Sequence, residues 1–555
     1  MTAEIRRAIA HPDRRERLAF GAAALSLLAV LVGGAFAALL AFAGTGPGFA
    51  ALLSDAYLQG VVRFTLLQAA LSTLLSIGFG LLLALALHRT RFPGRALVIR
   101  LMVLTQALPV LVGALAILAV WGRNGIVSEA LVAAGLGRLD VYGLGGILLA
   151  HTFFNMPLAA RLILSSLDAV PGESWKLAGQ LSMSPLATLR IVEAPAILKA
   201  LPGAASLVFM LCVTSFTLVL VLGGGPGATT LQVEIYQSLR ADFDPGRAAL
   251  LGLAQIALTL LVLAALLRLE RPTDTGATDG RTARRHDRPG AAVAALAAVI
   301  AGLGTAFLIA PFLAILMRGL AADLPRLLGE AAVQRAAGTS LALALVSALL
   351  SLTLSAPLLL AAETLRAERS AGLRRWRSVF TLSGGLVLVV PPIVLGAGWF
   401  LGLNRIADAF ALAPAVIVAA NALMAMPFVT RILAPALADA AARQDKLATS
   451  LGLSGLARLR LVELPALRRP MGLAFAYAMA LSLGDLGVVT LFGNEDLLTL
   501  PLLLYQRMGS YRTADAAGLA LLLGLGTLLI VVVAEQLFAA RTSRHRTFET
   551  GTSRS

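Results

Sequence analysis

The feature that most constrains this chain is a series of long apolar segments, rich in Leu, Ala and Val, that recurs from one end to the other. Each segment is continuous rather than alternating at period two, which favours helices over barrel strands. With 58% hydrophobic and 14% charged residues, the chain has too few polar groups to cover a soluble globule of 555 residues. Because about 20 helical residues cross a hydrocarbon core, we predict an all-α polytopic membrane protein with about 12 transmembrane helices.

A polar segment divides these predicted spans into two sets of six. Residues 268–290 are rich in Pro, Gly, Thr and charges and have no apolar period, which indicates a flexible linker. The predicted domains are therefore a first repeat at 1–267, this linker, and a second repeat at 291–555. The spans are expected near residues 20–43, 61–87, 101–121, 143–165, 201–222 and 248–267, and then near 291–317, 338–362, 379–402, 412–435, 471–492 and 514–537.

The two halves are related by duplication. Residues 176–195, KLAGQLSMSPLATLRIVEAP, return as residues 446–465, KLATSLGLSGLARLRLVELP, at a constant shift of 270. The agreement includes polar and cationic positions, which match by chance less readily than apolar positions in a chain rich in Leu and Ala. Because six spans is an even number, both halves enter the membrane from the same side and form parallel repeats.

Basic residues set the predicted orientation. With a cytoplasmic N-terminus, 33 of the 46 Lys and Arg residues fall in the termini, the linker and the loops on that side. Such an excess places both termini and the repeated loops, 166–200 and 436–470, in the cytoplasm. It also explains the net charge of +16 without a nucleic-acid partner. The composition suits a bacterial inner membrane, and the single cysteine, Cys212, excludes an intramolecular disulfide.

Each repeated loop has the pattern of a short helix, a turn and a lead-in helix. The turn falls at Ser184-Pro185 in the first copy and at Ser454-Gly455 in the second. One interpretation is a helix that lies in the lipid headgroups. The pattern also resembles the cytoplasmic loop of binding-protein-dependent ABC importer permeases, in which Glu-Ala-Ala, three residues, Gly, nine residues and Ile-x-Leu-Pro form the coupling helix that docks into an ATPase.

The second copy keeps more of that family pattern than the first. Gly452 and Pro465 stand at the family spacing, whereas Ser182 occupies the glycine position of the first copy and Pro195 matches the proline. Both copies begin with Lys in place of Glu, which puts in doubt an acidic contact with the ATPase. The resemblance implies the following ATPase-docking residues: Lys176, Leu177, Ala178, Ser182, Glu193, Pro195, Lys446, Leu447, Ala448, Gly452, Glu463 and Pro465.

Segments spread over nearly the whole chain resemble one family more closely, the fused permease of thiamine and thiamine diphosphate importers. They are RFPGR (91–95), GILLAHTFFNMPLAARL (146–162), LGGGPGATT (222–230), IYQ (235–237), LGDLGVVTLFGNEDLLTLPLLLYQ (483–506) and GSYR (509–512). The resemblance implies a MetI-like type I ABC importer permease that moves this substrate from periplasm to cytoplasm. A fused permease for iron(III) or another small solute shares the layout and is the alternative.

The same resemblance implies the partners. They are two copies of an ABC ATPase subunit, a periplasmic thiamine-binding protein and the lipid bilayer. The chain itself has no Gly-rich loop ending in Gly-Lys-Ser/Thr, no convergent catalytic set and no metal-ligand spacing. We therefore expect a transporter subunit rather than an enzyme, with ATP and Mg used by the partner ATPase.

One charged residue is expected at membrane depth. Asp485 is predicted inside the eleventh span, and Ser215 is its counterpart in the first repeat. Because a charge near hydrocarbon costs about 3 kcal/mol, this carboxylate should face the bundle interior or water. It could contact a cationic substrate, with Phe216 or Phe492 beside it. Equally, neighbouring hydroxyl groups could satisfy it.

Glycines follow the fifth span of each half on the predicted outer side. They permit a tight re-entry of the chain, which suits either a periplasmic gate or plain turns. The candidate gate residues are Gly223, Gly224, Gly225, Gly493 and Asn494. A different class, an ion-coupled secondary transporter, could also have twelve spans in parallel halves, but it would need several intramembrane charges where this chain has little beyond Asp485.

Overall fold

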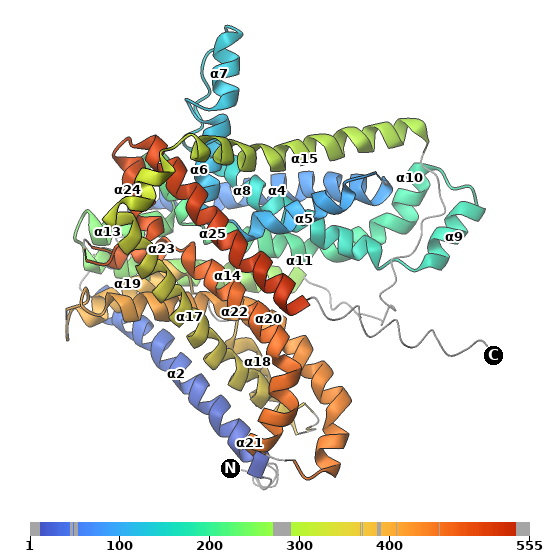
Figure 1. Ribbon diagram of the computed structural model, residues 1–555, viewed down its shortest axis with the longest axis vertical. Coiled ribbons are helices and arrows are strands. Elements are labelled where there is room, and N and C mark those ends of the chain that lie inside the picture. Colours follow the sequence, from blue (N-terminus) through green and yellow to red (C-terminus); the bar gives the residue numbers. More distant parts are fainter. Residues whose placement is uncertain are drawn as a thin grey trace. The chain divides into compact units, whose positions relative to one another are not determined.

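The computed structural model describes residues 12–44, 48, 54–90, 92–269, 290–366, 368, 370–385, 390–406, 408–453, 455–494 and 496–539. Every regular element in these ranges is a helix, which confirms the predicted all-α class (Figure 1). Most of the predicted linker (270–289), both terminal segments (1–11 and 540–555), Ser454 and the side chain of Lys446 lie outside the described residues.

The chain forms two compact units that do not follow the order of the sequence repeats. Unit 1 comprises Met1–Gly48, Ile235–Leu253 and Leu324–Ser555, and unit 2 comprises Phe49–Glu234 and Ala254–Asp323. The first helix of each sequence repeat is therefore part of the unit formed mainly by the other repeat. Helix α2 (Pro12–Ala43) belongs to unit 1, and α15 (Ala291–Leu320) belongs to unit 2. The predicted repeat boundaries therefore divide the sequence into its duplicated halves, and they do not mark the limits of the two compact units.

In unit 1, α2 packs against α17 and α19 through small residues. A Cβ atom at Gly398 of α19 would lie 2.4 Å from the Ala35 carbonyl oxygen of α2, so only glycine permits this approach. The helices of unit 1 are α2, α16 (Leu324–Gly329), α17 (Ala331–Thr364), α18 (Ala371–Ser383), α19 (Pro392–Leu403), α20 (Ala413–Ser450), α21 (Gly455–Arg458), the π-helix η4 (Leu459–Glu463), α22 (Leu464–Leu483), α23 (Gly487–Phe492), α24 (Leu500–Gly509) and α25 (Thr513–Ala539).

In unit 2, α15 packs against α4 and α6, and Gly304 of α15 fits against the Leu83 side chain of α4. The helices wholly within unit 2 are α4 (Ala56–Arg89), α5 (Arg95–Ala107), α6 (Val110–Trp121), α7 (Ile126–Ala133), α8 (Leu144–Asp168), α9 (Gly172–Gln180), α10 (Pro185–Thr188), the π-helix η1 (Leu189–Glu193), α11 (Ala194–Val213), α12 (Thr217–Leu222), the 3-10 helix η2 (Pro226–Ala228) and α15. Helices α13 (Leu231–Arg240) and α14 (Pro245–Leu269) contribute residues to both units.

Ten helices of the described chain are long and apolar enough to cross a membrane. Eight of the twelve predicted spans coincide with single helices, and the other four are interrupted. The third span breaks at Leu108-Pro109 because proline cannot continue the preceding helix. The fifth divides into α11 and α12, the ninth into α18 and α19, and the eleventh into α22 and α23. Asp485 therefore lies within the eleventh predicted span, at the break between its two helices.

Candidate functional site

The first repeated loop leaves its span through a helix break. Helix α8 ends at Asp168 and α9 begins at Gly172, directly after Pro171. Proline disfavours helical backbone in the residue before it, and glycine has a low helix propensity, so Pro171-Gly172 separates the two helices. Trp175 of α9 is buried, and its ring lies 5.2 Å from the ring of His88, centroid to centroid. Trp175 thus fixes α9 against the end of α4.

The second repeated loop has no such break. Helix α20 runs from Ala413 to Ser450 and includes the residues that correspond to α9 (Figure 1). The positions that match Pro171 and Gly172 at the shift of 270 are Ala441 and Ala442. Alanine is the best helix former, so the span continues into the loop without interruption. The separate short helix that we predicted here is therefore the end of a long one.

Both loops turn through the same backbone motif. Ser182 has φ 46° and Gly452 has φ 63°, so each adopts the left-handed conformation. In each copy the residue that follows donates its N–H to a carbonyl five positions back, from Met183 to Ala178 at 3.1 Å in the first copy. The equivalent bond of the second copy, from Leu453, measures 3.0 Å. These are Schellman turns, and Ser182 adopts at a steric cost what glycine adopts freely.

A π-helical segment follows in each copy, at matching positions. Segments η1 and η4 occupy Leu189–Glu193 and Leu459–Glu463, and each is closed by an N–H bond to the carbonyl five residues earlier. Pro195 and Pro465 stand two residues after these segments and offer no N–H to the helix. Single π-helical turns are rare and frequently occur at functional sites. Because both copies contain this segment, the two repeated loops share an unusual backbone conformation as well as sequence.

The last residue of each π segment is a buried glutamate. Glu193 is fully buried and forms a two-pronged ion pair with Arg89, whose Nε lies 3.2 Å from Oε1 and whose Nη2 contacts Oε2. His88 Nδ1 is 3.9 Å from the same Oε1. Arg89 is the last residue of α4, so this pair attaches the first loop to the end of the second span.

The second glutamate has a different partner. Glu463 accepts a hydrogen bond from Arg17 of α2, 446 residues away in sequence, and the Arg458 Nε lies 3.5 Å from the same oxygen. A second ion pair joins α2 to the segment between α17 and α18, because Arg14 lies 2.6 Å from Glu368. The first helix of the chain therefore holds the loop of the second repeat. Glu193 and Glu463 were predicted to dock an ATPase, but their side chains lie inside their units.

The leucines at the front of each loop are exposed instead. Leu177 and Leu181 are 55% and 64% exposed, and Leu447 and Leu451 are 61% and 64% exposed. Ala178 and Ala448, on the opposite side, are buried. Matching apolar exposure in two copies is typical of a surface that a partner covers. Of the other predicted docking residues, Lys176, Ser182, Pro195, Gly452 and Pro465 are exposed.

The candidate substrate residues lie at the breaks after α11 and α22. Ser215 is half-buried and Phe216 is buried, and both belong to unit 2. Asp485 is buried in unit 1, where its Oδ1 accepts a hydrogen bond of 3.0 Å from the Gly487 N–H at the start of α23. Its Oδ2 has no hydrogen-bond partner among the described residues. The hydrogen bond to the start of α23 accounts for one oxygen, and the substrate role remains a prediction.

The candidate gate positions favour glycine for two different structural reasons. Gly224 and Gly225 have φ values of 72° and 141°, which glycine adopts without strain. Gly223 and Gly493 are limited by space, since a Cβ atom would lie 2.6 Å from the Val219 carbonyl oxygen in the first case and 2.4 Å from a Leu502 methyl in the second. Asn494 accepts backbone N–H bonds from Asp496 and Leu497 in a turn. A gating role for these residues remains a prediction.

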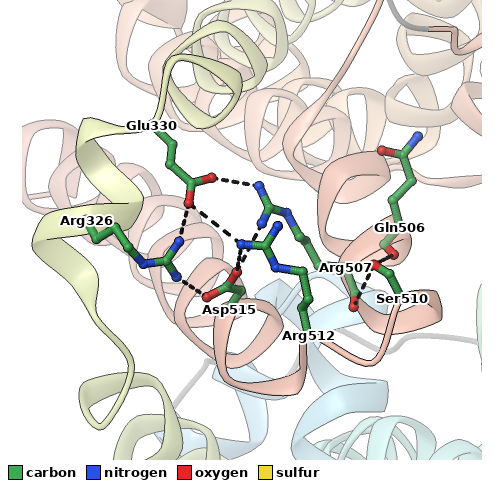
Figure 2. Close-up of polar contacts among 7 residues, drawn as sticks. All are labelled: Arg326, Glu330, Gln506, Arg507, Ser510, Arg512 and Asp515. Carbon is green, nitrogen blue, oxygen red and sulfur yellow. Dashed lines mark hydrogen bonds and ion pairs between the residues drawn. The ribbon is translucent and has the colours of Figure 1, made fainter.

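Unit 1 also contains a charged cluster that sequence reasoning missed. Figure 2 shows three arginines around two carboxylates at the starts of α17 and α25. Arg507 spans both acids, at 2.6 Å from Glu330 and 3.0 Å from Asp515. Arg326 contacts both as well, and Arg512 lies 2.6 Å from Asp515. The cluster joins α16, α17, α24 and α25. Local spacing relates Arg326 to Glu330 and Arg512 to Asp515, but the contact between these two halves joins residues 177 positions apart, which no local pattern predicts.

Buried polar contacts within the membrane-spanning helices involve two positions that match between the repeats, although the pairs themselves differ. In unit 2, the Asn155 amide donates to the Cys212 sulfur at 3.4 Å, and Ser72 contacts His151 at 2.9 Å. In unit 1, Asn421 donates to Ser482 at 2.8 Å. Asn421 and Ser482 match His151 and Cys212 at the shift of 270. These contacts support the interpretation of His151 as hydrogen-bonded structure.

An all-α chain with ten or more spans and a repeated, identically turned loop in each half has the architecture of a membrane transport permease. The chain belongs to the family of binding-protein-dependent transport system inner membrane components, whose model matches residues 76–274 and 370–546. One matched segment covers most of the first repeat and the start of the linker, and the other lies in the second repeat. The chain is therefore a multi-pass inner membrane protein and a transporter component rather than an enzyme.

Two similar proteins align with nearly the whole chain, and a third aligns with about half of it. The thiamine transport system permease protein ThiP of Brucella abortus (strain 2308) is 49% identical over 96% of this chain and 98% of its own length. The protein of the same name from Escherichia coli (strain K12) is 42% identical over 92% of this chain and 96% of its own. The sulfate transport system permease protein CysW of Synechococcus elongatus is 29% identical over 47% of this chain and 88% of its own.

Proposed function

We propose that this chain is the channel-forming permease of an ABC importer that moves thiamine or thiamine diphosphate from the periplasm to the cytoplasm. The observation that carries the proposal is the 49% and 42% identity to thiamine transport system permeases over more than nine tenths of the chain. The similarity to the sulfate permease is weaker and spans about half of this chain. The substrate assignment therefore follows the full-length relatives.

A separate ATPase supplies the energy in this proposal, and ATP and Mg are bound by that partner. The exposed pairs Leu177/Leu181 and Leu447/Leu451 support two matching contacts, one for each copy of the ATPase. The buried pairs Arg89–Glu193 and Arg17–Glu463 give each loop a firm connection to a spanning helix. Closure of the ATPase pair would then move both loops and open the path by alternating access.

The orientation of the proposal rests on the basic residues. An excess of Lys and Arg on one side favours a cytoplasmic location for both termini and for both repeated loops. The outer side then includes Gly223–Gly225, Gly493 and the Arg507 cluster, where a periplasmic thiamine-binding protein would deliver its substrate. Cysteine labelling with a membrane-impermeant thiol reagent checks this orientation. Ser182→Cys should react only from the cytoplasmic side, and Arg512→Cys only from the periplasmic side.

Reconstitution tests the proposal directly. The chain is assembled with its ATPase in liposomes, and uptake of radiolabelled thiamine is measured with the binding protein and ATP present. We expect uptake that requires all three components, with no uptake of iron(III) under the same conditions. Uptake by the purified chain without the ATPase would contradict an ABC importer and support an ion-coupled transporter. Uptake of iron(III) in place of thiamine would contradict only the substrate assignment.

A further inference from the structure

Helix α18 (Ala371–Ser383) is buried along one side only. Leu373 and Phe380 join the core of unit 1, and Ser383 is buried beside them. The helix packs against α17 and α2, and the Phe380 ring lies 3.5 Å from the position that a Cβ atom would occupy at Gly21 of α2. Helix α18 thus lies at the end of α2 that also carries Arg17, with most of its surface exposed.

The exposed surface of α18 combines positive charge with apolar side chains. Arg374, Arg375 and Arg377 are all exposed, and Trp376 between them is 50% exposed. Val379 lies four residues after Arg375, and Leu382 lies three residues after Val379, so these three residues share one face of the helix. Leu382 is 70% exposed. Cationic heads therefore stand next to a large apolar surface.

Nearby carboxylates do not neutralise these arginines. Glu363 pairs with Arg366 at 3.0 Å, and Glu368 pairs with Arg14 at 2.6 Å. Within the part of the chain that the structure describes, no ion pair joins Arg374, Arg375 or Arg377 to an acid. Like charges three residues apart on a helix repel each other. An anion that bound between them would relieve this repulsion.

The first repeat has no equivalent surface. Its corresponding helix, α5 (Arg95–Ala107), contains two arginines and no aromatic residue. One of them, Arg95, donates to the Leu87 carbonyl oxygen at 2.8 Å. The sequence RRWR, residues 374–377, is thus specific to the second repeat. Positive charge on this side of the membrane does not by itself explain why three arginines and a tryptophan gather on one of two equivalent helices.

We propose that α18 binds the headgroup of an anionic phospholipid. Guanidinium groups suit phosphate because they form paired, charge-assisted hydrogen bonds. Tryptophan is enriched at the membrane interface, where one side of the ring is apolar and the other polar. Trp376, Val379 and Leu382 contact the acyl chains, which a free phosphate ion would not supply. With the orientation proposed above, the lipid belongs to the inner leaflet.

Native mass spectrometry of the purified full chain tests this site, with phosphatidylglycerol and phosphatidylcholine as probes. We expect several-fold stronger retention of phosphatidylglycerol, and loss of that preference in the triple variant R374Q/R375Q/R377Q. The variant R335Q/R443Q/R460Q removes the same charge from exposed positions elsewhere in unit 1 and should keep the preference. Equal retention by the two triple variants would overturn the proposal in favour of a general charge effect.

A second measurement locates the lipid in the assembled transporter. Phospholipids brominated on their acyl chains quench nearby tryptophan emission, and the contribution of Trp376 is the difference between the native protein and Trp376→Phe. We expect brominated phosphatidylglycerol to quench this contribution more than brominated phosphatidylcholine does. Loss of the quenching when the ATPase subunit is added would overturn the proposal and assign the surface to that protein partner.

Discussion

The two copies of the repeated loop share a turn, a π-helical segment and a buried glutamate, but they are held by different parts of the chain. The first copy begins as a separate helix and is fixed by Arg89 at the end of α4, with His88 and Trp175 beside it. The second copy continues α20 and is fixed by Arg17 of α2. Duplication therefore preserved the loop, while its supports diverged.

That difference gives α2 a special position. It is the first helix of the chain, and it supports the loop of the repeat that follows it by several hundred residues. If the second loop moves during transport, the Arg17–Glu463 pair connects that movement directly to α2. The corresponding connection from the first loop is the Arg89–Glu193 pair, which leads to α4. Substitutions that separate these two routes can show whether transport needs both.

Loss of the buried arginines should have the largest effect. Arg89→Ala leaves the fully buried Glu193 without its guanidinium, and an uncompensated buried charge costs about 3–5 kcal/mol. Arg17→Ala should cost less, roughly 2 kcal/mol, because Arg458 remains 3.5 Å from Glu463. The measurement is thermal unfolding of the purified permease in detergent.

The control for these variants is Arg123→Ala, which breaks an exposed pair with Asp140. Both side chains are more than 60% exposed, so the change in stability should stay below about 1 kcal/mol. Equal losses for Arg89→Ala and Arg17→Ala would show that Arg458 does not compensate. The exchange Arg17→Glu with Glu463→Arg should restore part of the uptake that either single change removes.

A helix break introduced into the second loop should have the next largest effect. Ala441→Pro places a proline inside α20 at the position that matches Pro171, and proline in a helix interior costs about 3 kcal/mol. We expect thiamine uptake per ATP hydrolysed to fall, because the loop is no longer a rigid extension of its span. Ala441→Ser is the matched control and should leave this ratio nearly unchanged. A normal ratio in Ala441→Pro would mean that the continuity of α20 is dispensable.

Exchanges at the left-handed turn should have smaller effects of opposite sign. Gly452→Ala forces a side chain into φ 63° and should destabilise by about 1 kcal/mol, whereas Ser182→Gly should stabilise by a similar amount. Thermal unfolding measures the stability, and uptake per ATP hydrolysed measures the coupling. We expect the coupling to respond more to Gly452 than to Ser182. Equal responses would indicate that the ATPase engages both loops equivalently.

The smallest expected change in stability is that of Asp485→Asn. Asparagine can still accept a hydrogen bond from the Gly487 N–H, so Asp485→Asn should retain stability, whereas Asp485→Ala should lose about 1 kcal/mol with this hydrogen bond. Ser215→Ala is the matched change in the first repeat and should be nearly neutral. Uptake by a stable Asp485→Asn transporter separates the two interpretations. Unchanged uptake would remove the substrate role, and a large loss would support it.

Several features of the site could be read from local sequence. The repeat at a shift of 270 located both loops, and Pro195 and Pro465 marked their ends. The different entry into the two loops was also visible, since Pro171-Gly172 in one copy is Ala441-Ala442 in the other. The closely repeated residues begin only at Lys176 and Lys446, five positions after this difference, and they predict the same short helix in both copies. The φ of Ser182 could not be predicted, because serine rarely adopts the left-handed region.

The sequence by itself determined the class, the spans and the duplication, because hydrocarbon imposes helices of a fixed length and repeated residues reveal their origin. Only the tertiary structure decided which helices stand together. Helix α2 lies with the second repeat and α15 with the first, and ion pairs join Glu193 to Arg89 and Glu463 to Arg17. Helix packing through small residues and pairing of buried charges depend on proximity in space. Partners 446 residues apart leave no local pattern that would reveal that proximity.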